Sequence, residues 1–394
     1  MKCVEVYEKI YGQEPASVAF CPYRVSPLGA HIDHQHGIVN GLAINKGIHI
    51  AYHPKQNGVV ELKSLDFPKR AQFFVNAVPE IRENDWADHL RGAAKMLGEK
   101  YRLKIGLSGV IEGSLPIGGL SSSAAVIISF LTVLCRVNEI TLGYQELIDM
   151  AQAAEREYVG VACGKLDQSC EVLSKKDCLL HLDTRDGTFE RIPTPDGMKP
   201  YKIGIFFSGL ERSLKNSRYN LRQDECKAAA YALLGYAGME YGTFEDTRLR
   251  DVPFEVFAAY EDRLPKAWAA RARHYYGEME RVRKGTELWK KGDLKGYGQL
   301  VFESGHSSIV NYECGCEELK KLYEIMEKTD GIYGGRFSGA GFKGCCMALI
   351  DPAKAEEIQE KVEAAYLQAF PDLRGKYSFH LCESGEGVWE AMRG

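Results

Sequence analysis

The longest apolar run of the chain, Ala124 to Leu134, predicts a buried helix. It follows a turn in which Gly118 and Gly119 break regular structure and Ser121 to Ser123 offer hydroxyl groups. The N-terminus of a helix carries unpaired N–H groups and a partial positive charge, so it stabilises an anion placed against it. Phosphate is the candidate ligand, and a Ser-capped core helix is the alternative. The chain has no G-x-x-x-x-G-K-[ST] sequence, so this turn is not a P-loop.

The other hydrophobic patterns predict a mixture of strands and helices. Predicted strands are 17–21, 48–52, 59–65, 71–75, 103–111, 178–183, 201–207, 345–350 and 377–382. Predicted helices are 85–98, which contains Trp86, 141–158, with Thr141 as N-cap and Gly160 after its end, 217–234, 265–291, 316–328 and 353–369. The mixture lacks a strict βαβ repeat, which favours the α+β class. Three prolines and a glycine in 193–200 predict a domain boundary, giving domains 1–198 and 199–394.

Composition excludes several classes of protein. With 394 residues, 45% of them apolar, the chain is long enough for two domains with large cores. A net charge of -4 argues against a broad nucleic-acid surface. The longest apolar run is about half a membrane span, and the first residues lack the apolar core of a signal peptide, so we expect a cytosolic protein. The twelve cysteines are scattered without paired zinc-ligand spacing, which favours buried free thiols.

Three groups of polar residues stand out from this pattern. Residues 22–37 hold ionisable groups at a density unsuited to a core, but the histidines there would point in different directions, which disfavours a structural metal site. Glu155 and Glu157 lie in the last turns of a predicted helix, where they oppose its dipole, so they are either a solvated face or have another purpose. Asp167 stands alone among small and apolar residues.

Three glycine-rich stretches, near residues 24–37, 116–125 and 334–346, resemble in this order the motifs of the GHMP small-molecule kinases, specifically of galactokinases. The galactokinase pattern G-R-[VI]-N-[LI]-I-G-E-H-x-D-Y is similar to residues 23–34, G-L-S-S-S-A matches 119–124, and G-x-G-F-G-G-C resembles 339–345. Ala154-Glu155, Gly160, Cys163-Gly164 and Asp167-Gln168 match an intermediate pattern, and 271–278 and 303–308 are also similar. The resemblance covers nearly the whole chain.

The resemblance implies an ATP- and Mg²⁺-dependent kinase that phosphorylates the anomeric hydroxyl of a galactose-like sugar. It implies a ribosomal protein S5-like N-terminal domain and a ferredoxin-like C-terminal domain, and a small-molecule sugar or sugar acid as the only partner. By motif, Asp167 is the candidate base and Arg24 its charged neighbour, which agrees with the needs of phosphoryl transfer. The remaining roles implied are magnesium ligands Ser122 and Glu155; nucleotide contacts Trp86, Gly118, Gly119, Ser121, Ser122 and Ser123; and sugar contacts His31, Asp33, Gly164 and Tyr219.

The chain departs from the galactokinase pattern at several positions. The family's P-x-G-x-G-L is one residue longer than 116–120, so the phosphate loop must be rebuilt locally. Ala30 replaces a Glu that binds the sugar O6 in the family, and a C6 carboxylate would be repelled by that Glu. New cations occur at Lys165, Arg218 and His34, each either a substrate contact or surface charge.

Residues 27–35 also resemble plant galacturonate kinases more closely than galactokinases. Our hypothesis from the sequence is therefore that D-galacturonate is the substrate, with galactose as the alternative. Some galactokinase relatives act as sugar sensors without turnover. The retained Arg24, Asp167, Ser122 and Glu155 favour an enzyme over such a sensor.

Overall fold

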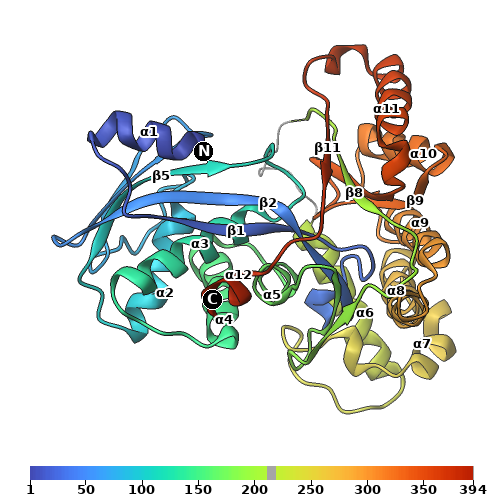
Figure 1. The fold of residues 1–394 in the computed structure, drawn as a ribbon. Helices are drawn as coiled ribbons and strands as arrows, with labels where there is room; N and C mark the ends of the chain where they lie inside the picture. Colours follow the sequence, from blue (N-terminus) through green and yellow to red (C-terminus); the bar gives the residue numbers. More distant parts are fainter. Residues whose placement is uncertain (211–218, 394) are drawn as a thin grey trace.

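Two sheets organise the computed structural model, which describes residues 1–210 and 219–393 (Figure 1). The larger sheet has the order β4-β3-β5-β2-β6-β7, with β1 paired to β2. Its strands are β1 (Ser17–Val25), β2 (Ile38–Lys55), β3 (Val59–Ser64), β4 (Ala71–Phe74), β5 (Gly106–Gly113), β6 (Cys178–Asp183) and β7 (Phe189–Pro193). The 18-residue β2 is its spine, because β1, β5 and β6 all pair with it, antiparallel.

Helices cover both faces of this sheet. Figure 1 shows α1 on one side and α2 to α5 on the other. These helices are α1 (Lys2–Tyr11), α2 (Asp88–Lys100), α3 (Ser122–Val137), α4 (Tyr144–Ala153), a π-helix (Ala154–Val159) and α5 (Leu166–Leu173). The apolar run predicted as a buried helix forms most of α3, whose residues from Ile127 to Leu131 are all buried. Because α3 is buried along most of its length, the position of its N-terminus is fixed by packing.

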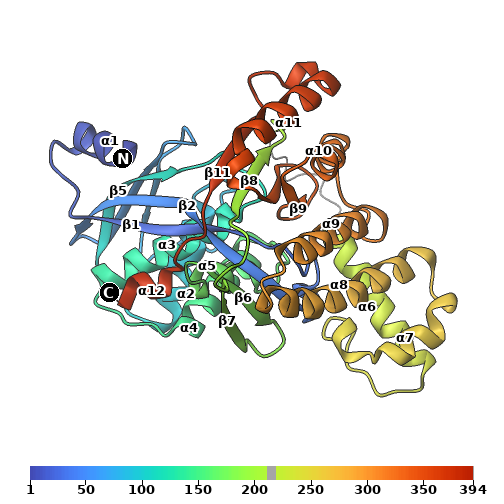
Figure 2. The ribbon, with the colours of Figure 1, turned by 45° about the vertical axis from the view of Figure 1, so that its right-hand side comes forward.

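The second sheet lies in the C-terminal half and has the order β11-β8-β10-β9, antiparallel throughout (Figure 2). Its strands are β8 (Lys202–Phe207), β9 (Ile332–Phe337), β10 (Cys345–Ile350) and β11 (Ser378–Cys382). Counted along this half, the order is 4-1-3-2, the order of the ferredoxin-like fold implied by the resemblance. The mixed helices and sheets confirm the α+β class.

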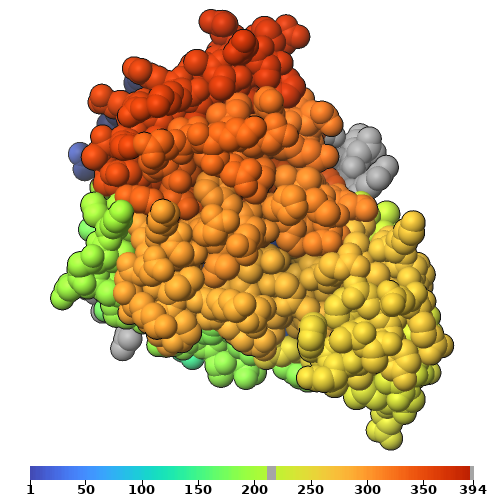
Figure 3. Space-filling view, turned by 90° about the vertical axis from the view of Figure 1, so that its right-hand side faces the viewer, coloured from blue at the N-terminus to red at the C-terminus, as the bar shows by residue number. Residues whose placement is uncertain are grey.

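Helices α9 and α10 pack on this second sheet, α11 packs on α10, and α8 packs on α9 and α6; α7 lies beside α6 (Figure 2). Their bounds are α6 (Tyr219–Tyr236), α7 (Phe254–Tyr260), α8 (Lys266–Lys290), α9 (Leu294–Val310), α10 (Glu317–Lys328) and α11 (Ala355–Ala369). Short 3-10 turns occur at Asp33–Gln35, Leu249–Asp251, Glu261–Arg263, Pro352–Lys354 and Pro371–Leu373. Antiparallel α8 and α9 form a hairpin whose outer face is seen in Figure 3.

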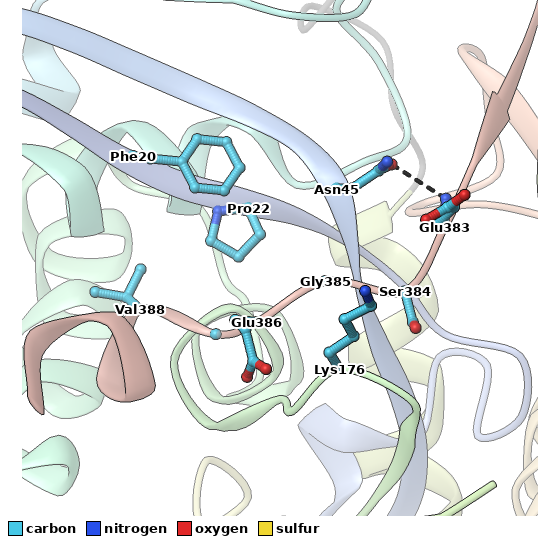
Figure 4. A pocket seen from close by; sticks show the side chains of 10 residues that line it. Phe20, Pro22, Asn45, Lys176, Glu383, Ser384, Gly385, Glu386 and Val388 are labelled. Carbon is cyan, nitrogen blue, oxygen red and sulfur yellow. Dashed lines mark hydrogen bonds between the residues drawn. The ribbon is translucent and has the colours of Figure 1, made fainter. Parts of the chain in front are cut away.

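After β11 the chain returns to the larger sheet. Glu383 exchanges hydrogen bonds with Asn45 on β2, at 3.0 and 3.1 Å, and Gly385 N donates to the carbonyl of Ala43 (Figure 4). The final helix, α12 (Val388–Arg393), packs on α5. A cavity of about 290 Å³ lies along this crossing, with Phe20 in its wall, and it does not include Asp167.

Several elements differ from their prediction. Trp86 precedes α2 instead of lying within it, because its indole N–H donates to Lys69 O at 2.7 Å and holds it in the preceding loop. Thr141 is not an N-cap, since α4 begins only after Gly143, and the helix becomes a π-helix from Ala154. Helices α1, α5, α7, α9 and α12 were not predicted.

Two general features complete the fold. All twelve cysteines are free thiols, and only Cys163 and Cys316 are partly exposed. Across residues 1–210 and 219–393, no helix is both long and apolar enough to cross a membrane.

Candidate active site

The three glycine-rich stretches meet at one backbone carbonyl, that of Gly119. Arg24 Nη1 donates to this oxygen at 3.0 Å, and Ser338 Oγ donates to it at 2.7 Å. Gly344 lies so close that a Cβ on it would be 2.8 Å from the Gly118 carbonyl carbon, and its φ of 102° also favours glycine. The turn before α3 is therefore held from both halves of the molecule.

Asp167 and Arg24 form an ion pair in contact with this turn. Arg24 Nε lies 2.7 Å from Asp167 Oδ1, and Ser121 Oγ donates to the other carboxylate oxygen. The Arg24 side chain is 5% exposed and that of Asp167 is 29% exposed, so the carboxylate keeps an open side. Burial opposes the charge of Arg24, but its pKa is raised because Asp167 lies beside it. The geometry fixes an accessible carboxylate in one orientation.

The backbone places both partners. The register of β1 against β2 shifts between Pro22 and Arg24, and Arg24 then pairs with Ala43 near the end of β1. Asp167 lies in the first turn of α5, the helix that the sequence did not predict. Cys163 to Ser169 has too few periodic apolar positions to indicate so short a helix.

Ser121 has a left-handed backbone, with φ 62° and ψ 33°, a conformation that costs a non-glycine residue free energy. Its hydroxyl bonds to Asp167, so it does not cap α3, and no side chain in the described residues does. The first N–H groups of α3, at Ser122 and Ser123, are thus available to an anion.

Glu171 lies beneath this pair, one helical turn after Asp167. Both of its carboxyl oxygens are buried and have no hydrogen-bond partner within residues 1–210 and 219–393. Burial raises the pKa of Glu171 well above its usual value, and the charge of Asp167 raises it further. Both effects disfavour a charged Glu171, so Asp167 is the main counter-charge of Arg24.

Asp33 and Gly164 form a second contact near Asp167. Leu166 N approaches Asp33 Oδ2 at 3.5 Å, and a Cβ on Gly164 would lie 2.1 Å from the same oxygen. Any side chain at Gly164 would therefore displace Asp33. Burial raises the pKa of Asp33 to about 6, and the neighbouring Asp167 contributes to this shift.

His31 and Tyr219 lie beside this contact. His31 has a left-handed backbone and stacks on Tyr312, with ring centroids 4.4 Å apart, and its ring lies 6.5 Å from that of Tyr219. Burial lowers the pKa of His31 well below its usual value, and Arg336 adds to the effect. His31 is thus a neutral, buried wall, with Tyr219 at its edge.

His34 does not supply the positive charge considered from the sequence. Gln35 Nε2 donates to its Nδ1 at 2.9 Å, so its Nε2–H donates to the hydroxyl of Tyr312 at 3.1 Å. Burial lowers the pKa of His34 to about 3, with a further contribution from Arg248. Lys165 pairs with Asp149 on α4 at 2.6 Å, which fits surface charge. Arg218 lies outside the described residues, as does Ser217, the predicted start of α6.

Ala30 is held by its backbone, from the other half of the molecule. Glu278 Oε2 on α8 accepts the N–H groups of Gly29 and Ala30, both at 3.0 Å. His274 Nε2, also on α8, donates to the Ala30 carbonyl at 2.8 Å. Burial opposes the charge of Glu278, yet its pKa is lowered because Arg281 lies beside it. The loop keeps its conformation although residue 30 has no functional side chain.

We expect Glu278→Gln to lower the free energy of unfolding by about 3 kcal/mol, because it leaves the largely buried Arg281 without its counter-charge. Denaturant unfolding measures this change. Glu280→Gln on the same helix removes an exposed i,i+4 pair with Lys284 and should change stability little. Equal losses in the two variants would contradict the assigned role.

Glu155 occupies the π-helix, a local geometry enriched at functional sites. It is 4% exposed, and Gln168 Nε2 donates to its Oε2. The π-helix packs on α3, whose first residue is Ser122. The two oxygens expected to bind magnesium thus come from neighbouring elements.

Trp86 is separate from this cluster. Its ring is parallel to that of Phe67, with centroids 6.1 Å apart, and Phe67 is 40% exposed. The loop that carries Trp86 leads into α2, which packs on both α3 and the π-helix.

Three residues that connect the two halves had no role assigned from the sequence. Glu278, His274 and Ser338 each hold a backbone group of a glycine-rich stretch. The sequence signal that could have identified Glu278 and His274 is their spacing of four residues within 271–278. This spacing places both side chains on one face of α8.

Comparisons with known proteins agree with this geometry. The chain matches the GHMP kinases N terminal domain over residues 88–175, the GHMP kinases C terminal domain over 286–368 and the galactokinase galactose-binding signature over 5–54. It is 40% identical to a galacturonokinase of Arabidopsis thaliana, covering 94% of this chain and 92% of that protein. It is 30% identical to a galactokinase of Roseiflexus sp. (strain RS-1), covering 98% and 96%.

The fold is similar to the crystal structure of Lactococcus lactis galactokinase complexed with galactose, with a TM-score of 0.87 and 27% identity over 98% of this chain and 97% of that one. The two-domain fold implied by the motifs is thereby confirmed. The chain belongs to the galactokinase family of the GHMP kinases, and it is a sugar kinase.

Proposed function

We propose that this chain transfers the γ-phosphoryl group of ATP to the anomeric hydroxyl of D-galacturonate. The observation that carries the proposal is the accessible Asp167 carboxylate, fixed by Arg24 and Ser121 beside the uncapped end of α3. Phosphoryl transfer depends mainly on positioning and charge stabilisation, which these groups supply. Ala30, 2% exposed, supports the choice of a sugar acid because no carboxylate stands at position 30 itself.

In this proposal Asp167 accepts or orients the proton of the C1 hydroxyl. Its oxygens are held by Arg24 Nε and Ser121 Oγ, so it is already oriented before substrate binds. The N–H groups of Ser122 and Ser123, with the backbone of Gly118 and Gly119, bind the phosphates. Arg24 stabilises charge on the transferring group, and Trp86 with Phe67 lines the adenine site.

We assign the magnesium ligands to Glu155 and Ser122. A buried carboxylate oriented by an amide, beside a hydroxyl on an uncapped helix, fits a cation that takes one or two protein oxygens and completes its shell with phosphates and water. When bound, Mg²⁺ neutralises phosphate charge.

Glu155→Gln is expected to raise the Mg²⁺ concentration that gives half-maximal activity by about 10- to 100-fold, because a neutral amide is a weaker ligand. A magnesium titration at saturating ATP measures this. Glu157→Gln, an exposed position on the same π-helix, is the matched control and should not move the midpoint. An unshifted midpoint for Glu155→Gln would remove Glu155 from the proposed site.

Asp33, His31, Gly164 and Tyr219 form the proposed sugar site, in which Asp33 accepts sugar hydroxyls when ionised. Because its pKa is about 6, protonation below this value removes the negative charge and turns one acceptor oxygen into a donor, which weakens its bonds to sugar hydroxyls. We expect the KM for the sugar to rise about tenfold between pH 7 and pH 5. Asp33→Asn should have a raised KM that no longer depends on pH over this range; a wild-type KM that stays flat would contradict the role.

A steady-state comparison of D-galacturonate with D-galactose tests the substrate. Galactose is the second candidate, supported by the galactose-binding signature over residues 5–54. Higher kcat/KM for galacturonate supports our proposal, and equal or better turnover of galactose overturns it. We also infer a cytoplasmic location, because twelve free thiols suit a reducing compartment.

A further inference from the structure

A cavity lies against the α8–α9 hairpin and is lined by residues of α8, α9 and α10. Its volume is about 410 Å³, enough for a small ligand. The rings of Phe302 and of Tyr323, on α10, form apolar parts of its wall. The lining residues of α8 are Arg273, Gly277 and Arg281, and those of α9 include Gln299, Glu303 and His306. They recur every three or four positions, so each helix contributes one continuous ridge.

Arg281 is the least satisfied cation of this cavity. Its Nε donates to Glu278 at 2.6 Å, but its Nη2 is buried and has no hydrogen-bond partner in the described residues. The guanidinium lies over Gly277, where a Cβ would come within 3.0 Å of Nη2. The Arg281 side chain is 16% exposed, so part of it remains accessible to an oxyanion in the cavity, which would form a charge-assisted interaction with the guanidinium.

The cavity wall also contains carboxylates. Glu303 is exposed, and Glu327 accepts from the hydroxyl of Tyr323 at 3.2 Å. Arg273 is partly neutralised by Glu261. A bare anion would meet repulsion from these glutamates, whereas sugar hydroxyl groups would donate to them. The lining therefore suits a ligand that combines an oxyanion with several hydroxyl groups.

Two hydrogen-bond connections run from the cavity to Ala30. Arg281 bonds Glu278, which accepts the Ala30 N–H, and Ser307, in the cavity wall, bonds His274 Nδ1 at 2.9 Å, whose Nε2 bonds the Ala30 carbonyl. Each connection passes through one side chain only. A ligand that fixes Arg281 would thus also fix the sugar loop.

We propose that this cavity is a second binding site, for a polyhydroxylated oxyanion such as a sugar phosphate or a sugar acid, and that its occupation tightens sugar binding at the Ala30 loop. The site is distinct from the one assigned to the reaction. Its existence does not depend on which sugar is the substrate.

Calorimetric titration of the full chain, saturated with Mg²⁺, a non-hydrolysable ATP analogue and its sugar substrate, tests the proposal with the first site filled. The probes are D-glucose 6-phosphate, D-glucuronate, inorganic phosphate and D-glucose. We expect 1:1 binding of the first or second probe, which distinguishes a sugar phosphate from a sugar acid, and at least tenfold weaker binding of phosphate and glucose. Failure of both hydroxylated oxyanions to bind would overturn the site.

Two variants place the binding in the cavity. Arg273→Gln and His306→Ala should weaken probe binding at least tenfold and leave kcat without probe unchanged, whereas Glu280→Gln, on α8 outside the cavity, should bind as the wild type does. Saturating probe should lower the KM for the sugar about fivefold in the wild type and not in the first two variants. Undiminished probe binding in both cavity variants would overturn the location, and an unchanged wild-type KM would overturn the coupling.

Discussion

Replacing Asp167 by Asn is expected to lower kcat by about 10²- to 10⁴-fold on the preferred sugar. The amide keeps the shape of the side chain and one oxygen for Arg24 Nε, but it cannot accept a proton from the C1 hydroxyl. Because Arg24 is almost fully buried, it also loses its counter-charge, so some loss of stability accompanies the change. Steady-state kinetics at saturating substrates, with a thermal melt of the same sample, separate the two effects.

Asp149→Asn is the matched control for this variant. It removes the carboxylate that pairs with Lys165 on the surface, and Lys165 lies two residues before Asp167 in the sequence. The ion pair between Arg24 and Asp167 stays intact. We expect its kcat to match the wild type. Retention of kcat within tenfold by a folded Asp167→Asn protein would show that the carboxylate neither accepts nor orients the proton.

The elements predicted from the sequence were those whose hydrophobic pattern is strong. The apolar run at 124–134 became the buried α3, and the continuous apolar run at 345–350 became β10 with unchanged bounds. Helix α9 was missed because Gly296, Gly298 and Gly305 weaken its propensity. Those glycines serve packing, since a Cβ on Gly298 would lie 2.1 Å from the Tyr333 carbonyl. Tertiary contact therefore overrides local preference in this helix.

The parts of the candidate site that could be predicted from the sequence are the residues that the motifs themselves contain. Asp167 and Arg24 form the pair that their motif implied, and Gly164 packs on Asp33. The residues that hold the backbone of the site, Glu278 and Ser338, could not be predicted. Each contacts a residue that lies hundreds of positions away in the sequence. Nor does the sequence show that Ser121 adopts a left-handed backbone and turns its hydroxyl to Asp167.

The side chains that hold the backbone of residue 30 also explain how the loop keeps its conformation with Ala at this position. In a loop held only by its side chains, loss of a carboxylate would leave the backbone free to move. Here Glu278 and His274 bind the N–H and the carbonyl of residue 30, so its side chain is free to set specificity. The nearby buried histidines are neutral and lend no charge to C6 recognition: burial lowers the pKa of His34 to about 3 and that of His274 to about 4. Selection for a sugar acid at this position therefore rests on the absence of repulsion.

Ala30→Glu should lower kcat/KM for D-galacturonate by about 10³-fold and change that for D-galactose far less. Two like charges about 4 Å apart repel by about 4 kcal/mol at an effective dielectric of 20, and each 1.4 kcal/mol is a factor of ten. Galactose carries a hydroxyl at C6, which would donate to the new carboxylate. Paired assays of both sugars on one preparation measure the ratio directly.

Because Ala30 is buried, a larger side chain also changes the space available, and Ala30→Gln separates this effect from charge. The Gln variant has nearly the same bulk as the Glu variant without its charge, so we expect it to weaken both sugars to a similar degree. The difference between the two variants on galacturonate then measures the electrostatic part alone. If they lose the same activity on galacturonate, steric exclusion and not charge governs residue 30, and the physical reason for assigning a sugar acid to this chain fails.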